Sequence, residues 1–180
     1  MISPSFFEEF PALIETELRY VEFLDIPTAA DLTSEIPNGR YEFFEYFCTD
    51  ANCDCQQVTI NVTSYELNKS WAIIQYGWGS GKGTARFTLH PHSINNSISN
   101  EFLEFFKEMI YRDWRYAARI QKHYLQFKER MREREALNAT KNYIHNILGK
   151  KNRQNDLCHC NSGKKFTKCC LQTASLEKVI

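Results

Sequence analysis

The chain has 180 residues, a formal net charge of zero, 43 % hydrophobic residues and 14 % aromatic residues. This apolar content suffices for a globular core and excludes a chain that is disordered throughout. No apolar run approaches the ~20 residues that a bilayer span needs, and the acidic stretch 1–9 lacks the pattern of a secretory signal. The sequence therefore predicts a soluble, cytoplasmic protein.

The zero net charge hides an uneven distribution along the chain. Residues 1–60 contain 12 Asp or Glu and 2 Lys or Arg, whereas residues 101–180 contain 9 and 17. The basic second half can face an anionic partner, or it can pack against the acidic front of the same chain. Charge alone does not separate these alternatives, and nothing in the sequence indicates an oligomeric state.

Residues 5–24 have apolar side chains at mixed spacings of three and four, which predicts a helical segment. Pro11 falls inside this pattern and should kink the helix or start a second turn. Residues 25–39 contain Pro27, Pro37 and Gly39, so we expect a loop there.

Four strand-like runs follow, at residues 39–48, 58–63, 71–76 and 85–89. In the second run, apolar residues such as Val58 and Ile60 alternate with polar residues. The short connections favour an antiparallel meander. The Gly-rich run 77–84 resembles a phosphate-binding loop, but Tyr76 and Gly83 stand where that motif requires Gly and Ser or Thr, so a hairpin turn is expected.

An apolar stripe with helical spacing then continues for 29 residues, which predicts one long helix with a buried face. Ser99 or Asn100 is the expected N-cap, and Gly149 the expected end. A break near residues 138–140 is left open. The stripe consists of Leu103, Phe106, Ile110, Trp114, Ala117, Ile120, Tyr124, Phe127 and Met131.

These elements predict an α+β fold: a small antiparallel four-stranded sheet, an N-terminal helical segment, a long covering helix and a short metal-held C-terminal tail. The expected organisation is an α+β domain at residues 1–149, with a metal-bound turn between two strands as a possible feature. A polar linker at 150–156, a cysteine-rich motif at 157–172 and a tail at 173–180 follow.

The seven cysteines form two clusters, and clustered cysteines in a chain without a secretory signal favour metal binding over disulfides. Cys158, Cys160, Cys169 and Cys170 have the spacing C-x-C-x8-C-C. Four thiolates at ~2.3 Å around Zn²⁺ make a closed structural site, and iron also accepts four thiolates. Because this segment is too short to have much of a core, the metal should supply most of its folding free energy.

This stretch resembles the SEC-C motif, the metal-binding tail of the bacterial translocation ATPase SecA that is also attached to many unrelated proteins. Its pattern is C-x-C-x8-C followed by Cys or His, and Gly163-Lys164-Lys165-Phe166 resembles its Gly-Lys-Lys-aromatic turn. His159 and Asn161 depart from the usual Pro and Gly at positions that are not ligands. In SecA the motif docks a chaperone and the ribosome, so the resemblance implies a binding module.

Cys48, Cys53 and Cys55 form the second cluster, a C-x4-C-x-C run between the first two predicted strands. Tetrahedral Zn²⁺ needs a fourth ligand, for which His123 is the first candidate and Asp50 or Asp54 the next. The alternative is that the three cysteines are small core residues. The run also resembles cysteine runs that precede SEC-C tails in other bacterial proteins, which implies no activity.

The sequence thus favours a zinc-binding adaptor that docks onto a protein or ribosome-like partner, with Lys164, Lys165 and Lys168 in contact with the partner. One alternative is a metal-dependent enzyme with an open site at Cys48, Cys53 and Cys55, although no known catalytic motif is present. The other alternative is a nucleic-acid binder that uses the basic C-terminal half. Its candidate contacts on the long helix are Lys122, Lys128, Arg130, Arg132, Arg134 and Lys141.

Overall fold

The computed structural model describes residues 4–24, 34–79, 85–149, 157–158 and 160–170. The chain divides into two compact units, a first unit of residues 1–132 and a second unit of residues 133–180. No helix in the described ranges is long and apolar enough to cross a membrane.

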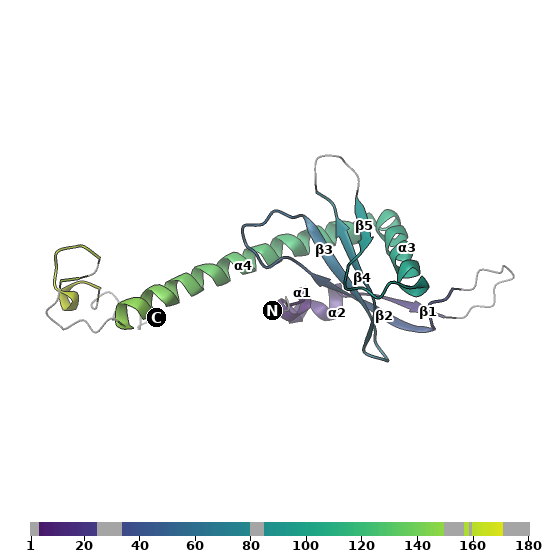
Figure 1. The fold of residues 1–180 in the computed structure, drawn as a ribbon, viewed down its shortest axis with the longest axis horizontal. Coiled ribbons are helices and arrows are strands. Elements are labelled where there is room, and N and C mark those ends of the chain that lie inside the picture. The colour runs from purple at the N-terminus through teal and green to yellow at the C-terminus, as the bar shows by residue number, and fades with distance from the viewer. Residues whose placement is uncertain (1–3, 25–33, 80–84, 150–156, 159, 171–180) are drawn as a thin grey trace. The chain divides into compact units, whose positions relative to one another are not determined.

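The first unit is built on a five-stranded antiparallel sheet whose strands follow one another in chain order (Figure 1). The predicted α+β class with an antiparallel meander is confirmed, with five strands in place of four. The strands are β1 (Arg19–Phe23), β2 (Gly39–Tyr46), β3 (Gln57–Ser64), β4 (Lys69–Gly77) and β5 (Arg86–Leu89).

The additional strand is β1, which lies in the segment expected to be helical. Only short helices form before it: α1 (Phe6–Glu9), η1 (Pro11–Leu13) and α2 (Ile14–Glu17). Pro11 opens η1 and lacks the N–H that a continuous helix requires. In the strand, Val21 and Phe23 pack against the core, while the pairing of Arg19 with Phe43 anchors the strand to β2. Long-range pairing has thus overridden the local helical spacing.

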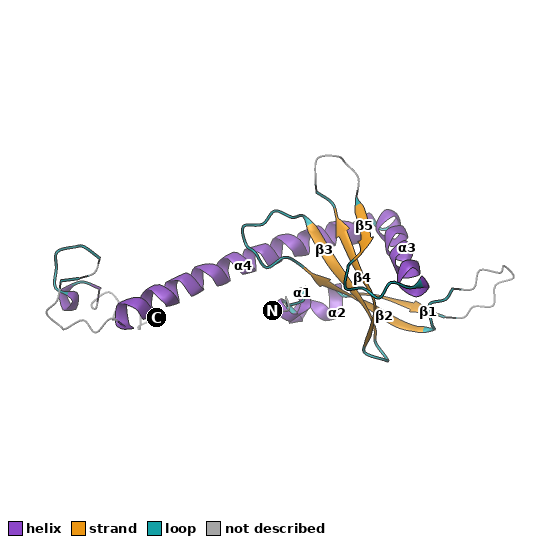
Figure 2. Ribbon diagram, in the orientation of Figure 1, coloured by secondary structure: helices purple, strands orange, loops and turns teal. Residues whose placement is uncertain are grey.

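Alternation along the central strands separates a core face from an open face. Phe43, Ile60 and Ile74 are fully buried. The helix α3 (Ser97–Arg112) packs against β4 and β5 (Figure 2), and its Phe106 contacts the rings of Phe43 and Tyr76. The residues between the buried positions, such as Thr59, lie on the other face of the sheet and are half-buried.

The expected long helix is two helices, α3 and α4 (Trp114–Gly149), separated at Asp113. The Asp113 carboxylate accepts a hydrogen bond from the backbone N–H of Tyr116 at 3.2 Å, so it begins a new helix as Asp commonly does. The break shifts the phase of the apolar stripe. Tyr116 becomes buried, and Trp114, expected on the buried face, is 71 % exposed.

The N-terminal end of α3 also differs from the expectation. Asn96, and not Ser99 or Asn100, is the N-cap of α3, and its side chain and that of Ser99 form a reciprocal capping box. Helix α4 continues without a break through residues 138–140, the point that the sequence left open, and it ends at Gly149 as expected.

Three expected features fall outside the described residues. These are the tip of the Gly-rich turn at 80–84, the linker at 150–156 and the tail at 173–180. The strands β4 and β5 on either side of the turn pair antiparallel, as a hairpin requires.

Candidate functional site

The C-terminal cysteines lie on a short backbone loop in the second unit. A bridge joins Leu157 to Lys165, and the N–H of Cys158 donates to the carbonyl of Lys164 at 2.7 Å. A single turn, η2 (Phe166–Lys168), then carries the chain to the second cysteine pair. Phe166 and Cys158 are buried, at 8 % and 4 % exposure. The loop brings both cysteine pairs together, but it has little apolar core.

Two residues in this loop adopt a left-handed backbone conformation. Asn161 has φ +57° and Gly163 has φ +68°. Glycine occupies this region without steric cost, and asparagine is among the few other residues that are enriched there. The departure of Asn161 from the usual glycine is therefore compatible with the same turn.

The structure brings together the sulfurs of Cys158, Cys160, Cys169 and Cys170, all within 4.8 Å of one another. The Sγ atom of Cys160 lies 3.4 Å from those of Cys158 and Cys169. The Sγ atoms of Cys158 and Cys170 are 3.3 Å apart. Four sulfurs at ~2.3 Å from a tetrahedral ion would be about 3.8 Å apart. The cluster thus has the dimensions of a four-thiolate metal site.

Ser162 is part of this cluster, and the sequence analysis missed it. Its hydroxyl oxygen lies 3.1 Å from the sulfur of Cys160 and 3.2 Å from that of Cys169. The pKa of Cys160 is lowered to about 6, mainly by its hydrogen bond to Ser162 and next by those to the thiols of Cys158 and Cys169. A hydroxyl in the turn between the cysteine pairs is the signal that could have indicated this role.

The crowded thiols do not ionise equally. The contact with Cys158, followed by that with Cys160, raises the pKa of Cys170 to about 12. The last proton is hard to remove because the new charge would lie beside the other sulfurs. A divalent cation would compensate these charges, and thiolates are the form of cysteine that binds metals.

The three expected contact residues lie on the same loop as the cluster. Lys164, Lys165 and Lys168 are all exposed, while η2, which includes Lys168, is fixed by the buried ring of Phe166. The loop therefore carries three exposed cationic side chains in addition to the four thiols.

Comparison with known families assigns this segment. The description of the matching family is SEC-C motif, and its family model matches residues 155–172. The chain carries a SEC-C motif. The match covers a tenth of the chain, and no curated protein and no solved structure matches the chain. The SEC-C motif and its cysteine cluster indicate that the protein binds a metal ion.

The structure also brings together Cys48, Cys53 and Cys55, outside the SEC-C motif. Their sulfurs lie within 4.8 Å of one another, in the connection between β2 and β3. Asp50 shapes this turn: its carboxylate accepts from the N–H of Asn52 at 2.9 Å, and its carbonyl accepts from that of Cys53 at 3.2 Å. Among the described residues, no ligand atom of a His, Asp or Glu lies with these sulfurs, so the structure does not bring Asp50 or Asp54 into the group.

His123 is not with these cysteines, and the expected Cys₃His set is not formed. Its Nδ1 lies 2.8 Å from Glu45 and its Nε2 lies 2.5 Å from Glu17. The ring is fully buried and stacks on Phe6 with centroids 4.0 Å apart. Each ring nitrogen is thus within hydrogen-bond distance of one glutamate side chain. His123 is thus a structural ion-pair residue that joins the N-terminal segment and β2 to α4.

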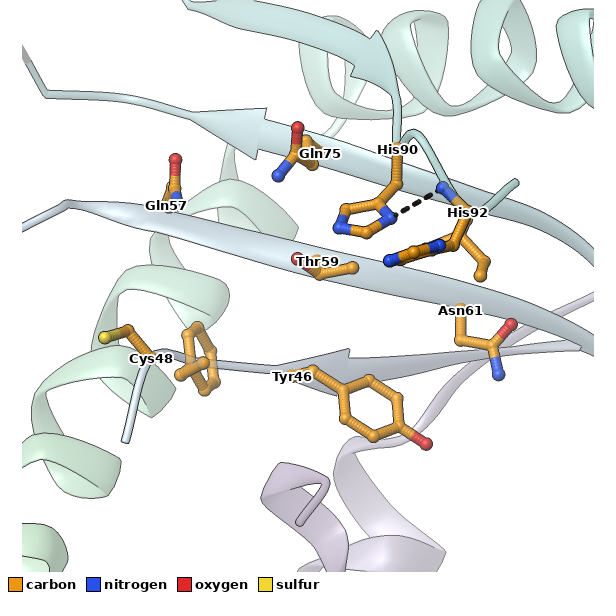
Figure 3. Close-up of a pocket in the computed structure, with 10 residues that line it drawn as sticks. Tyr46, Cys48, Gln57, Thr59, Asn61, Gln75, His90 and His92 are labelled. Atoms are coloured by element: carbon orange, nitrogen blue, oxygen red, sulfur yellow. Dashed lines mark hydrogen bonds between the residues drawn. The ribbon is translucent and has the colours of Figure 1, made fainter. Parts of the chain in front are cut away.

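A groove of about 500 Å³ lies on the open face of the sheet (Figure 3). Neutral side chains such as Thr59 and Ile73 line much of it, polar and apolar ones together. His90 and His92 lie toward one end, and Cys48 lies toward the other. Through Cys48, the groove adjoins the three-cysteine cluster.

Proposed function

We propose that this protein is a zinc-binding interaction protein whose SEC-C motif docks onto an acidic surface of a protein or ribosome-like partner. The observation that carries the proposal is the convergence of four thiols on a loop that also carries three exposed lysines. A four-thiolate set leaves no coordination position for a substrate, so it suits a structural role. The motif's role in SecA, to which this segment is similar, supports docking over catalysis.

Lys164, Lys165 and Lys168 are the proposed contact residues. The metal fixes their backbone, so the charges are presented without the entropic cost of ordering a free tail. Such charges mainly increase the rate of association and the selectivity for an acidic partner.

The nucleic-acid alternative relies on the basic residues of α4, and two observations weaken it. Lys128 is buried at 2 % exposure, and Arg132 pairs with Glu129 at 3.0 Å. The charges available on this helix are thus fewer than the sequence predicts.

Cosedimentation with purified ribosomes, together with elemental analysis, tests the proposal. The metal should be zinc, with iron as the other outcome. Neutralising the three motif lysines (Lys164→Gln, Lys165→Gln, Lys168→Gln) should weaken binding about tenfold or more. The matched control neutralises three exposed basic residues outside both candidate contact sets, Arg86, Arg112 and Arg115, and should bind as the wild type does.

Equal loss in both triple variants would contradict docking through the motif. Binding to protein-free ribosomal RNA that equals binding to whole ribosomes would favour the nucleic-acid alternative.

A further inference from the structure

We propose that Cys48, Cys53 and Cys55 form a second zinc site, with three protein thiolates and a fourth coordination position that opens to a small neutral ligand from solution. Their sulfurs lie within 4.8 Å of one another, although the cysteines come from both ends of the β2–β3 connection. Three thiolates and one exchangeable ligand complete the tetrahedron that Zn²⁺ prefers.

The protein offers no fourth ligand within the described residues. The cluster contains only the three cysteines, and the ring nitrogens of His123 are both occupied by carboxylates. His90 and His92 lie toward the far end of the groove (Figure 3). A metal held by the three thiolates therefore retains one position for an external molecule.

Lys128 supplies the second, independent observation. Its side chain is 2 % exposed. Its ammonium donates a hydrogen bond of 2.5 Å to the backbone carbonyl of Asp50, which lies in the β2–β3 connection. Within the described part of the chain, no carboxylate pairs with it. Buried charges are normally paired, and the other group that the described residues place against this ammonium is the ring of Tyr124, whose centroid is 5.6 Å away.

The net charge of the proposed zinc site supplies a counterion for Lys128. Zn²⁺ with three thiolates carries one net negative charge, which balances one buried ammonium. A neutral fourth ligand, such as water or an imidazole nitrogen, keeps this balance, whereas a fourth thiolate would add a second negative charge.

Access to the open position is also present. All three cysteines are half-buried, and Cys48 lines the groove on the open face of the sheet. In that groove Gln57, Thr59 and Gln75 offer neutral hydrogen-bonding groups beside apolar ones, so the lining suits a small uncharged ligand such as imidazole.

The test uses the full chain with all four SEC-C cysteines replaced by serine, so the docking proposal does not affect the result. This variant should bind one Co²⁺ with thiolate-to-metal charge-transfer bands, and adding imidazole should shift the ligand-field bands. Further substitution of Cys53→Ser should abolish binding, and the neighbouring control Asp54→Ser should retain it. Circular dichroism verifies that each variant remains folded.

Absence of bound Co²⁺ in the folded four-serine variant would overturn the site, and a spectrum that does not respond to imidazole would overturn the open position. Lys128→Gln keeps a donor for the Asp50 carbonyl but removes the charge, so zinc affinity should fall about tenfold or more. Lys122→Gln, an exposed change on the same helix, should leave the affinity unchanged. Equal affinity in both variants would overturn the role of Lys128.

Discussion

The two cysteine clusters gather their sulfurs within the same distance, but different structures hold the backbone around them. In the SEC-C motif, Cys158 and Phe166 are the buried residues of the described segment. In the first unit, the other three cysteines lie in the connection between the paired strands β2 and β3, and Phe47 and Ala51 of this connection are buried at 3 % exposure. The SEC-C motif should therefore depend on its metal for folding, whereas Cys48, Cys53 and Cys55 lie on a scaffold that folds without one.

Metal removal should produce the largest difference between the two regions. A structural zinc ion contributes about 10–16 kcal/mol to the folding of small zinc-binding segments. Chelation should therefore unfold residues 157–170 and leave the sheet intact. Hydrogen exchange measures this directly, because the amides of Cys158 and Lys168 donate to backbone carbonyls of the loop.

The control for this experiment is the set of amides in β3 and β4, which pair along eight positions and should keep their protection. Loss of protection in these strands on chelation would contradict the comparison, because the first unit would then also depend on a metal. Retained protection at Cys158 would show that the loop folds without an ion.

The first unit has an ion-pair network where the SEC-C motif has its four-cysteine cluster. The hydrogen bond from His123 lowers the pKa of Glu17 below its usual value near 4.5. The folded state therefore holds this proton less readily than the unfolded state, so the stability is present above pH ~4.5 and is lost as pH falls through the folded pKa.

Glu17→Gln should consequently cost about 1.5–3 kcal/mol in unfolding free energy near pH 7, and its difference from the wild type should shrink below pH ~4. Chemical denaturation across this pH range measures the effect. Glu15→Gln, an exposed change on the same helix α2, is the control and should follow the wild type. A difference that does not change with pH would show that Glu17 contributes through packing alone.

Local patterns in the sequence predicted the parts of the fold that depend on neighbouring residues. The alternation at Val58 and Ile60 predicted β3, and the helical spacing predicted the buried face of α3. The strand β1 and the break at Asp113 were missed because both depend on distant contacts. Arg19 pairs with Phe43 across the sheet, and Tyr116 is buried against Phe106.

The same distinction separates the candidate sites. The SEC-C cysteines were predictable because a motif of thirteen residues contains both pairs. The surroundings of His123 were not, because its partners Glu45 and Glu17 lie 78 and 106 residues away in the chain. No local spacing indicates which carboxylates the tertiary fold places beside an imidazole ring.

Ser162→Ala should have the smallest effect, and it tests how far the motif depends on more than its thiols. Removing the hydroxyl leaves Cys160 and Cys169 without a shared hydrogen-bond partner. Loss of such an outer-shell contact typically lowers metal affinity about 10- to 100-fold, so we expect a tenfold loss in a competition titration against a chelator of known affinity. Asn161→Gly is the control, since glycine accepts the same positive φ and Asn161 does not contribute a thiolate partner. Equal affinity of Ser162→Ala and the wild type would mean that four thiolates alone determine how tightly the motif holds its ion.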